Sequence, residues 1–135
     1  MKSDKQQMSY VPQTSEHIKI TSVKNGTDVY DIKLPIGAII EDIVVVKKTL
    51  FGVVNADVNL GNTTTANDYT ATAIDAGSGG SAGVAGVDAG DRMTPVPADQ
   101  IVRVSVTGTA ANTAGVVYVW VNYRFDSNPY PTQLV

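Results

Sequence analysis

The stretch that decides the fold is Val116-Val117-Tyr118-Val119-Trp120-Val121-Asn122-Tyr123, which is apolar on both faces of an extended chain. Successive side chains of a β-strand point to opposite faces, so the valines at odd positions share one face and Tyr118 and Trp120 share the other. A strand that is apolar on both sides needs a cover on both sides. A second sheet supplies one cover. No helical apolar stripe occurs in the chain, so we expect another subunit to supply the second cover.

The rest of the chain repeats the β pattern. Apolar and polar residues alternate in four segments and a fifth is apolar on both faces, and β-branched residues, which suit a pleated surface, are frequent in all of them. With two weaker segments and the stretch above, this makes about eight short strands at roughly 8–12-residue spacing, which is typical of an antiparallel sandwich or jelly roll. The segments are 18–21, 30–34, 39–46, 54–60, 69–74, 93–96 and 102–107.

Turn residues predict the connections. Asn25-Gly26 suits a type I′ hairpin between the first two strands, and the small residues of 108–115 predict a second hairpin loop before the last strand. The longest gap, 75–92, contains the glycine-rich stretch 77–83, and loops of this length are usually functional or mobile. We expect the sandwich domain at 17–125, preceded by a flexible N-terminal arm at 1–16 and followed by an extended C-terminal tail at 126–135.

Composition excludes several classes of function. The chain has 135 residues, no cysteine and a formal net charge of −3, with its charges scattered. Absence of cysteine rules out thiolate metal sites, iron–sulfur clusters and cysteine nucleophiles. A nucleic-acid partner would need a clustered basic face, and a membrane partner a span of about 18 apolar residues. Neither is present, and the polar start has no apolar stretch typical of a secretory signal.

Residue types used in catalysis are present without a catalytic pattern. His17 is the single histidine, and the glycines of 77–83 lack the lysine and the helix of a phosphate loop. The stretch 88–91 has two aspartates but not the spacing or the terminal glutamate of an EF-hand, so a turn role is favoured over calcium binding. The two glutamates, Glu16 and Glu41, and three aspartates, Asp42, Asp57 and Asp68, could supply the carboxylate pair of a glycosidase, but nothing in the sequence brings two of them together. We expect no enzymatic activity, no metal and no cofactor.

A family resemblance rests on four separate segments that follow one another in the chain, 34–45, 58–62, 101–110 and 115–119. A Gly/Ala/Ser/Thr-rich stretch lies between the second and the third. Together they resemble the small jelly-roll capsid decoration, or cement, proteins of tailed bacteriophages. The resemblance implies a homotrimeric jelly roll on the outer surface of the capsid, bound to the major capsid protein where capsid subunits meet. Similar modules also occur in head fibres and tail fibres.

The expected sites follow from this interpretation. Tyr118 and Trp120 are predicted to lie at the subunit interface, where aromatic residues are favoured anchors. The capsid-binding part of the arm is predicted at Ser9, Tyr10, Val11 and Pro12. The alternative is a fibre module that binds a host receptor or a glycan, which would carry its aromatic residues on loops. The chain instead places aromatic residues in predicted strands, and this favours the structural role; they are Tyr69, Tyr118, Trp120 and Phe125.

Overall fold

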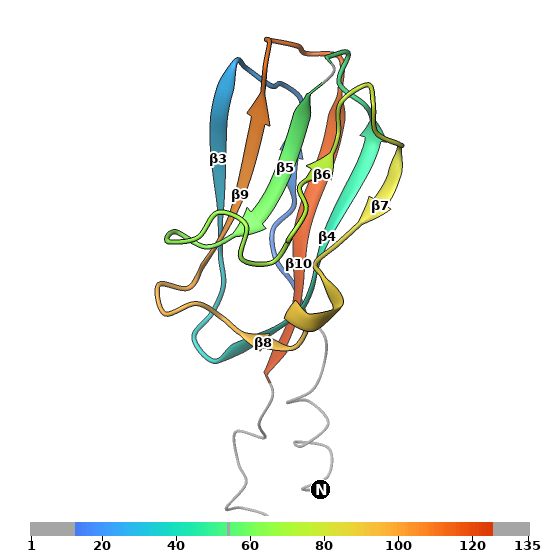
Figure 1. Cartoon of the computed structure of the whole chain (residues 1–135). Coiled ribbons are helices and arrows are strands. Elements are labelled where there is room, and N and C mark those ends of the chain that lie inside the picture. Colours follow the sequence, from blue (N-terminus) through green and yellow to red (C-terminus); the bar gives the residue numbers. More distant parts are fainter. Residues whose placement is uncertain (1–12, 54, 126–135) are drawn as a thin grey trace, which may run out of the picture.

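Two antiparallel sheets pack face to face in a computed structural model that describes residues 13–53 and 55–125 (Figure 1). These residues contain no α-helix, so the prediction of an all-β sandwich is confirmed. The first sheet contains β1 (Gln13–Thr14), β2 (Ile18–Ile20), β4 (Ala38–Thr49), β7 (Gly83–Ala85), β8 (Thr94–Pro95) and β10 (Val116–Phe125). The second contains β3 (Gly26–Lys33), β5 (Ala56–Gly61), β6 (Ile74–Asp75) and β9 (Ile101–Gly108).

In both sheets, strands from the first half of the chain pair with strands from the second half. In the first sheet β10 pairs with β4 along its whole length. On its other edge β10 pairs with β1 and β2, and on its other edge β4 pairs with β7 and β8. In the second sheet the order is β3-β9-β5-β6. Counting β1 with β2 and β7 with β8 as interrupted edge strands leaves eight strands that pair first with last, second with seventh, third with sixth and fourth with fifth. This is jelly-roll pairing.

Apolar side chains of both sheets meet in one core between them. In β10 the side chains of Val117, Val119 and Val121 are fully buried, whereas Tyr118 and Trp120 remain partly exposed, as the alternation predicts. The core positions of the neighbouring strands alternate in the same way, at Ile43 and Val45 of β4 and at the even-numbered valines of β9. Burial of these side chains holds the sheets together through the hydrophobic effect.

Both hairpin predictions are wrong. Asn25-Gly26 lies at the start of β3, but β2 pairs with β10 in the first sheet and β3 pairs with β9 in the second. The loop 109–115 likewise connects β9 and β10, which belong to different sheets. Residue types at a turn report local backbone preference, whereas the sheet that the next strand joins depends on contacts distant in sequence.

Three predicted boundaries also change. The gap 75–92 contains β7 and a 3₁₀ turn, η1 (Ala89–Asp91), and the predicted strand 69–74 shrinks to β6, with Tyr69 buried in a turn. Part of the predicted arm joins the first sheet: β1 pairs with β10, and Ser15 donates its backbone N–H to the carbonyl of Val121, 2.9 Å away. Backbone hydrogen bonds, which leave no hydrophobic pattern, hold this segment. The expected contacts of Ser9, Tyr10, Val11 and Pro12, and the tail 126–135, lie outside the described residues.

Candidate interaction surfaces

The outer face of the first sheet carries aromatic and aliphatic side chains in rows across the strands. One row runs from Lys19 of β2 through Tyr118 of β10 and Val46 of β4 to Val84 of β7. Beside it, Trp120 is the register partner of Val44. Tyr118, Trp120, Val44 and Val46 are all partly exposed, and Val84 keeps 74% of its surface exposed. We call this surface the aromatic face.

Two basic side chains lie over the aromatic rings of this face. The imidazole of His17 stacks on the indole of Trp120 with ring centroids 4.6 Å apart and an interplanar angle of 19°. The ammonium of Lys19 lies 5.9 Å from the centroid of the Tyr118 ring, within the range of a cation–π contact. Both come from the segment along the free edge of β10. The sequence did not predict these contacts, because nothing local indicates that residues 17–19 lie beside β10.

The outer face of the second sheet has a different chemistry. Arg103 of β9 donates to both carboxylate oxygens of Asp31 on β3, at 2.8 Å from Nε and 3.0 Å from Nη2. Four register pairs further along, the hydroxyls of Thr27 and Thr107 lie 2.9 Å apart. Hydrogen bonding by Arg103 lowers the pKa of Asp31 below its usual value. Such exposed ionic and hydroxyl pairs are compatible with a face in contact with water.

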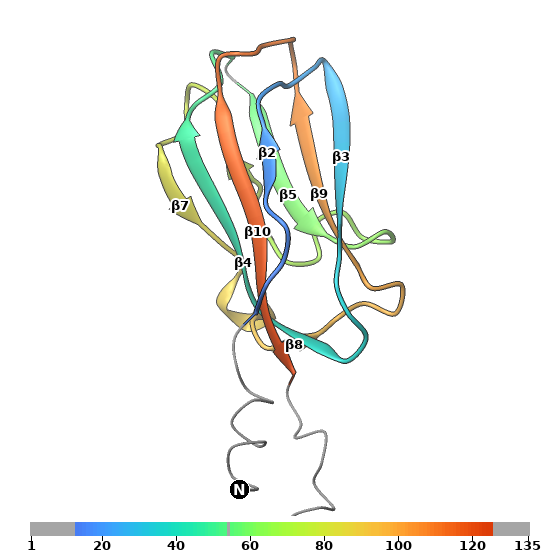
Figure 2. The same cartoon turned by 180° about the vertical axis from the view of Figure 1, so that it is seen from behind.

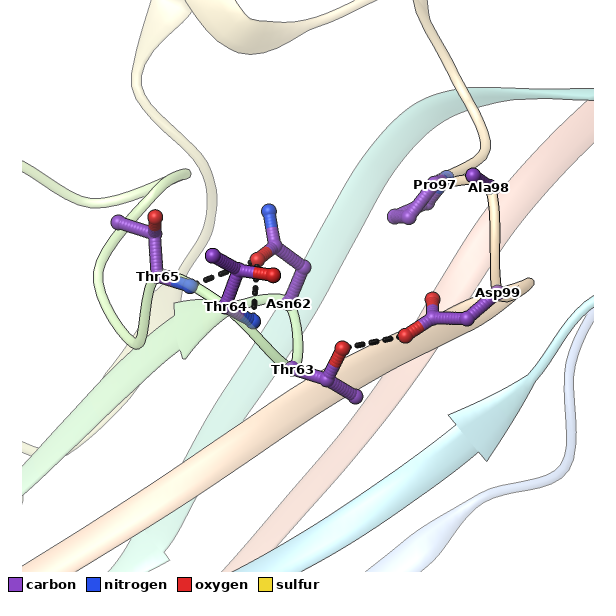
Figure 3. A pocket seen from close by; sticks show the side chains of 7 residues that line it. All are labelled: Asn62, Thr63, Thr64, Thr65, Pro97, Ala98 and Asp99. Atoms are coloured by element: carbon purple, nitrogen blue, oxygen red, sulfur yellow. Dashed lines mark hydrogen bonds between the residues drawn. The ribbon is translucent and has the colours of Figure 1, made fainter.

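An open pocket of about 450 Å³ lies between the loop that follows β5 and the loop that precedes β9 (Figure 3). The two loops are joined by a hydrogen bond from the Thr63 hydroxyl to the carboxylate of Asp99. That bond, together with the backbone N–H of Ile101, lowers the pKa of Asp99. The lining residues are Asn62, Thr63, Thr64, Thr65, Pro97, Ala98 and Asp99.

The wall of this pocket is fixed by hydrogen bonds within its own loop. The side-chain oxygen of Asn62 accepts the backbone N–H groups of Thr64 at 2.9 Å and Thr65 at 2.7 Å, and its amide nitrogen donates to Asp68. A Cβ atom added at Gly61 would lie 2.1 Å from the carbonyl oxygen of Thr65, so only glycine lets this loop fold back on β5. Hydroxyls and one carboxylate suit a ligand rich in hydroxyl groups, but no aromatic ring lines the pocket on which a sugar would stack.

Two of the acidic residues named in the sequence analysis accept hydrogen bonds from backbone N–H groups. Asp88 accepts the N–H of Ala71 at 2.7 Å, and Asp42 accepts that of Ile43 at 2.9 Å. Among residues 13–53 and 55–125, no cluster of three or more histidine or carboxylate side chains is placed to hold a metal ion. No helix in these same ranges has the length and apolar character needed to cross a membrane.

Comparison with known proteins gives one informative result. No protein-family model matches the sequence, and no curated protein matches it. Among solved structures, the chain is similar to a chain of the cyanophage Pam1 capsid asymmetric unit, with a TM-score of 0.66 and 22% sequence identity. The alignment covers 87% of this chain and 86% of that chain. A likeness at this identity establishes a shared fold, the β-sandwich described above.

Proposed function

We propose that the chain is a virion structural protein, and specifically a capsid decoration protein that assembles as a homotrimer on the outer surface of a phage head. The observation that carries the proposal is the fold, which nearly the whole chain shares with a chain of the cyanophage Pam1 capsid. The similarity extends over most of both chains, which supports a structural role for the sandwich as a whole.

The contrast between the two outer faces supports self-association, which the proposal takes to be a trimer. Tyr118 and Trp120 lie among valines on the aromatic face, whereas the opposite face carries the Asp31–Arg103 ion pair. Aromatic residues are enriched and most charged residues are depleted in the core of subunit interfaces. In this proposal the aromatic faces of three copies meet, and the second sheet faces water.

The polar pocket favours the alternative, a fibre module that binds a host glycan. Its threonine hydroxyls and the Asp99 carboxylate could pair with sugar hydroxyls. The decoration role is favoured because it explains the partly exposed aromatic rings, which lie on a sheet face and not at the pocket. The proposal includes no catalytic step.

The test uses heads of the phage that encodes the chain, assembled after deletion of its gene. The purified chain is mixed with these heads, and sedimentation separates bound from free protein. Binding that saturates at a fixed number of copies per head supports a decoration protein. Absence of binding to heads, with binding to whole host cells instead, overturns it in favour of the fibre module.

A further inference from the structure

The two ends of the sandwich differ in their exposed side chains. One end is formed by the turn between β3 and β4, by β8 and by the end of β10, and we call it the terminal end (Figures 1 and 2). Its most exposed large apolar side chain is Ile36, with 79% of its surface accessible, and Pro35 and Pro95 are exposed beside it. The opposite end includes the loops 21–25 and 109–115, whose exposed residues are Thr21, Ser22, Lys24, Asn25, Thr109, Ala110, Ala111, Thr113 and Ala114.

Ile36 is held at the apex of a tight turn. The backbone N–H of Ala38 donates to the carbonyl of Pro35 at 3.3 Å, and Gly37 has a φ of +84°. A positive φ at the third residue defines a type II turn, which glycine adopts without strain. Pro35 also fixes its own φ just before the apex. An apolar side chain on such a turn loses little backbone freedom when it binds, which favours its use as an anchor.

The aromatic rings of Phe125 and Tyr123 lie between this turn and the hydrophobic core. The ring of Phe125 lies 3.9 Å from the position that a Cβ atom of Gly37 would occupy, so it packs against the turn. Tyr123 meets Phe125 edge to face, with centroids 6.3 Å apart, and itself packs against the hydrophobic core. Ile36 is therefore connected to the core through two rings, and the terminal end offers a small apolar surface with a firm base.

Both ends of the described chain lie here. Gln13 is the register partner of Tyr123, and Phe125 is the register partner of Ala38. Residues 1–12 and 126–135 therefore join the domain beside the Ile36 turn. Any partner that these two segments bind at their junction with the domain must approach the terminal end.

We infer that the terminal end is the surface that seats the domain on a folded protein shell, with the Ile36 side chain inserted into an apolar depression of the shell protein. This inference rests on the proposed function and adds the orientation of the domain: the sandwich stands on its terminal end, and the loops 21–25 and 109–115 point away from the head. Three copies that meet through their aromatic faces can all present this end to one surface.

The experiment compares two exposed apolar side chains. Ile36→Asn removes the anchor, and Val29→Asn is the matched control, because Val29 is 53% exposed on the second sheet, away from both proposed interfaces. Circular dichroism and sedimentation of the free proteins establish that each variant keeps its fold and its oligomeric state. Binding to heads lacking the chain is then measured as copies bound at a series of concentrations.

The expected result is a loss of affinity of about tenfold or more for Ile36→Asn, equivalent to about 1.4 kcal/mol, and a change of less than about twofold for Val29→Asn. Equal binding by Ile36→Asn and the unchanged chain overturns the inference and leaves the proposed function intact. A comparable loss for Val29→Asn also overturns it, because the terminal end would then have no special role. Failure of the unchanged chain to bind heads overturns the proposed function and the inference together.

Discussion

The imidazole of His17 lies flat against the indole of Trp120, 4.6 Å between ring centroids, although the two residues are more than a hundred positions apart in the chain. This contact places a basic side chain over part of the aromatic face. The indole remains partly exposed and points away from the sandwich core. We therefore expect Trp120 to contribute to association and not to folding of the monomer.

Trp120→Ala is expected to dissociate the proposed trimer while the β-structure persists. The ring is outside the core, so its removal leaves the packing of Val119 and Val121 unchanged. At an interface, truncation of an aromatic anchor costs about 2 kcal/mol or more. Circular dichroism and sedimentation at several concentrations measure the two effects. A loss of β signal at every concentration would instead assign the indole a role in monomer folding.

Asn112→Ala is expected to lower the free energy of unfolding by about 0.5–1.5 kcal/mol, because both side-chain hydrogen bonds are exposed and water can replace the lost acceptor. The side-chain oxygen of Asn112 accepts the backbone N–H groups of Gly52 at 2.9 Å and Ala114 at 3.0 Å, and its backbone pairs with Val23. Its removal leaves two donors without their partner. The control Thr113→Ala, at the exposed neighbouring position, should change stability by less than about 0.5 kcal/mol in urea unfolding. Equal effects of the two substitutions would contradict the role of Asn112 in linking these loops.

Gly115→Ala is expected to destabilise the fold by about 1–3 kcal/mol through overpacking. A Cβ atom at this position would lie 2.5 Å from the ring of Phe51, and Phe51 is only 1% exposed, so its ring has no open space to enter. Gly90→Ala is the control, because a Cβ atom there meets nothing within 4 Å. Thermal unfolding of both variants measures the difference. A melting temperature for Gly115→Ala equal to that of the unchanged chain would mean that β10 shifts at little cost.

Alkaline pH is expected to destabilise the protein through Tyr69. Burial, reinforced by Asp68, Asp91 and Asp99, raises the pKa of Tyr69 to about 12. In the unfolded chain a tyrosine ionises near pH 10, so above about pH 10 the unfolded state loses the proton first and the free energy of unfolding falls as the pH rises towards 12. Tyr69→Phe should remove this part of the decrease. Tyrosinate absorbance, compared between the two proteins, checks the assignment; a difference signal centred near pH 10 would contradict it.

The local apolar pattern predicted which residues enter the core. It did not predict which sheet each strand joins, because that depends on the topology of the whole chain. The alternation in 116–123 correctly assigned Val117, Val119 and Val121 to the interior and Tyr118 and Trp120 to the outside. The sheet to which each strand belongs could not be deduced from Asn25-Gly26, because almost every pairing in this fold joins segments distant in sequence.

The surfaces were predicted less well than the core for the same reason. The stacking of His17 on Trp120 and the hydrogen bond from Thr63 to Asp99 each join residues that have no local signal for one another. β7 was missed because a strand of three residues, Gly83–Ala85, is too short for a period to be seen. The apolar turn at Ile36 was visible in the sequence as Pro-Ile-Gly, but its position beside both chain ends was not.

Cryo-electron microscopy of gene-deleted heads, imaged before and after addition of the purified chain, tests whether the chain decorates the capsid. We expect three-lobed density on the outer surface of the capsid where capsid subunits meet, with one sandwich fitting each lobe and the Ile36 turn towards the shell. Heads that look identical before and after addition, or density confined to fibres, would contradict it.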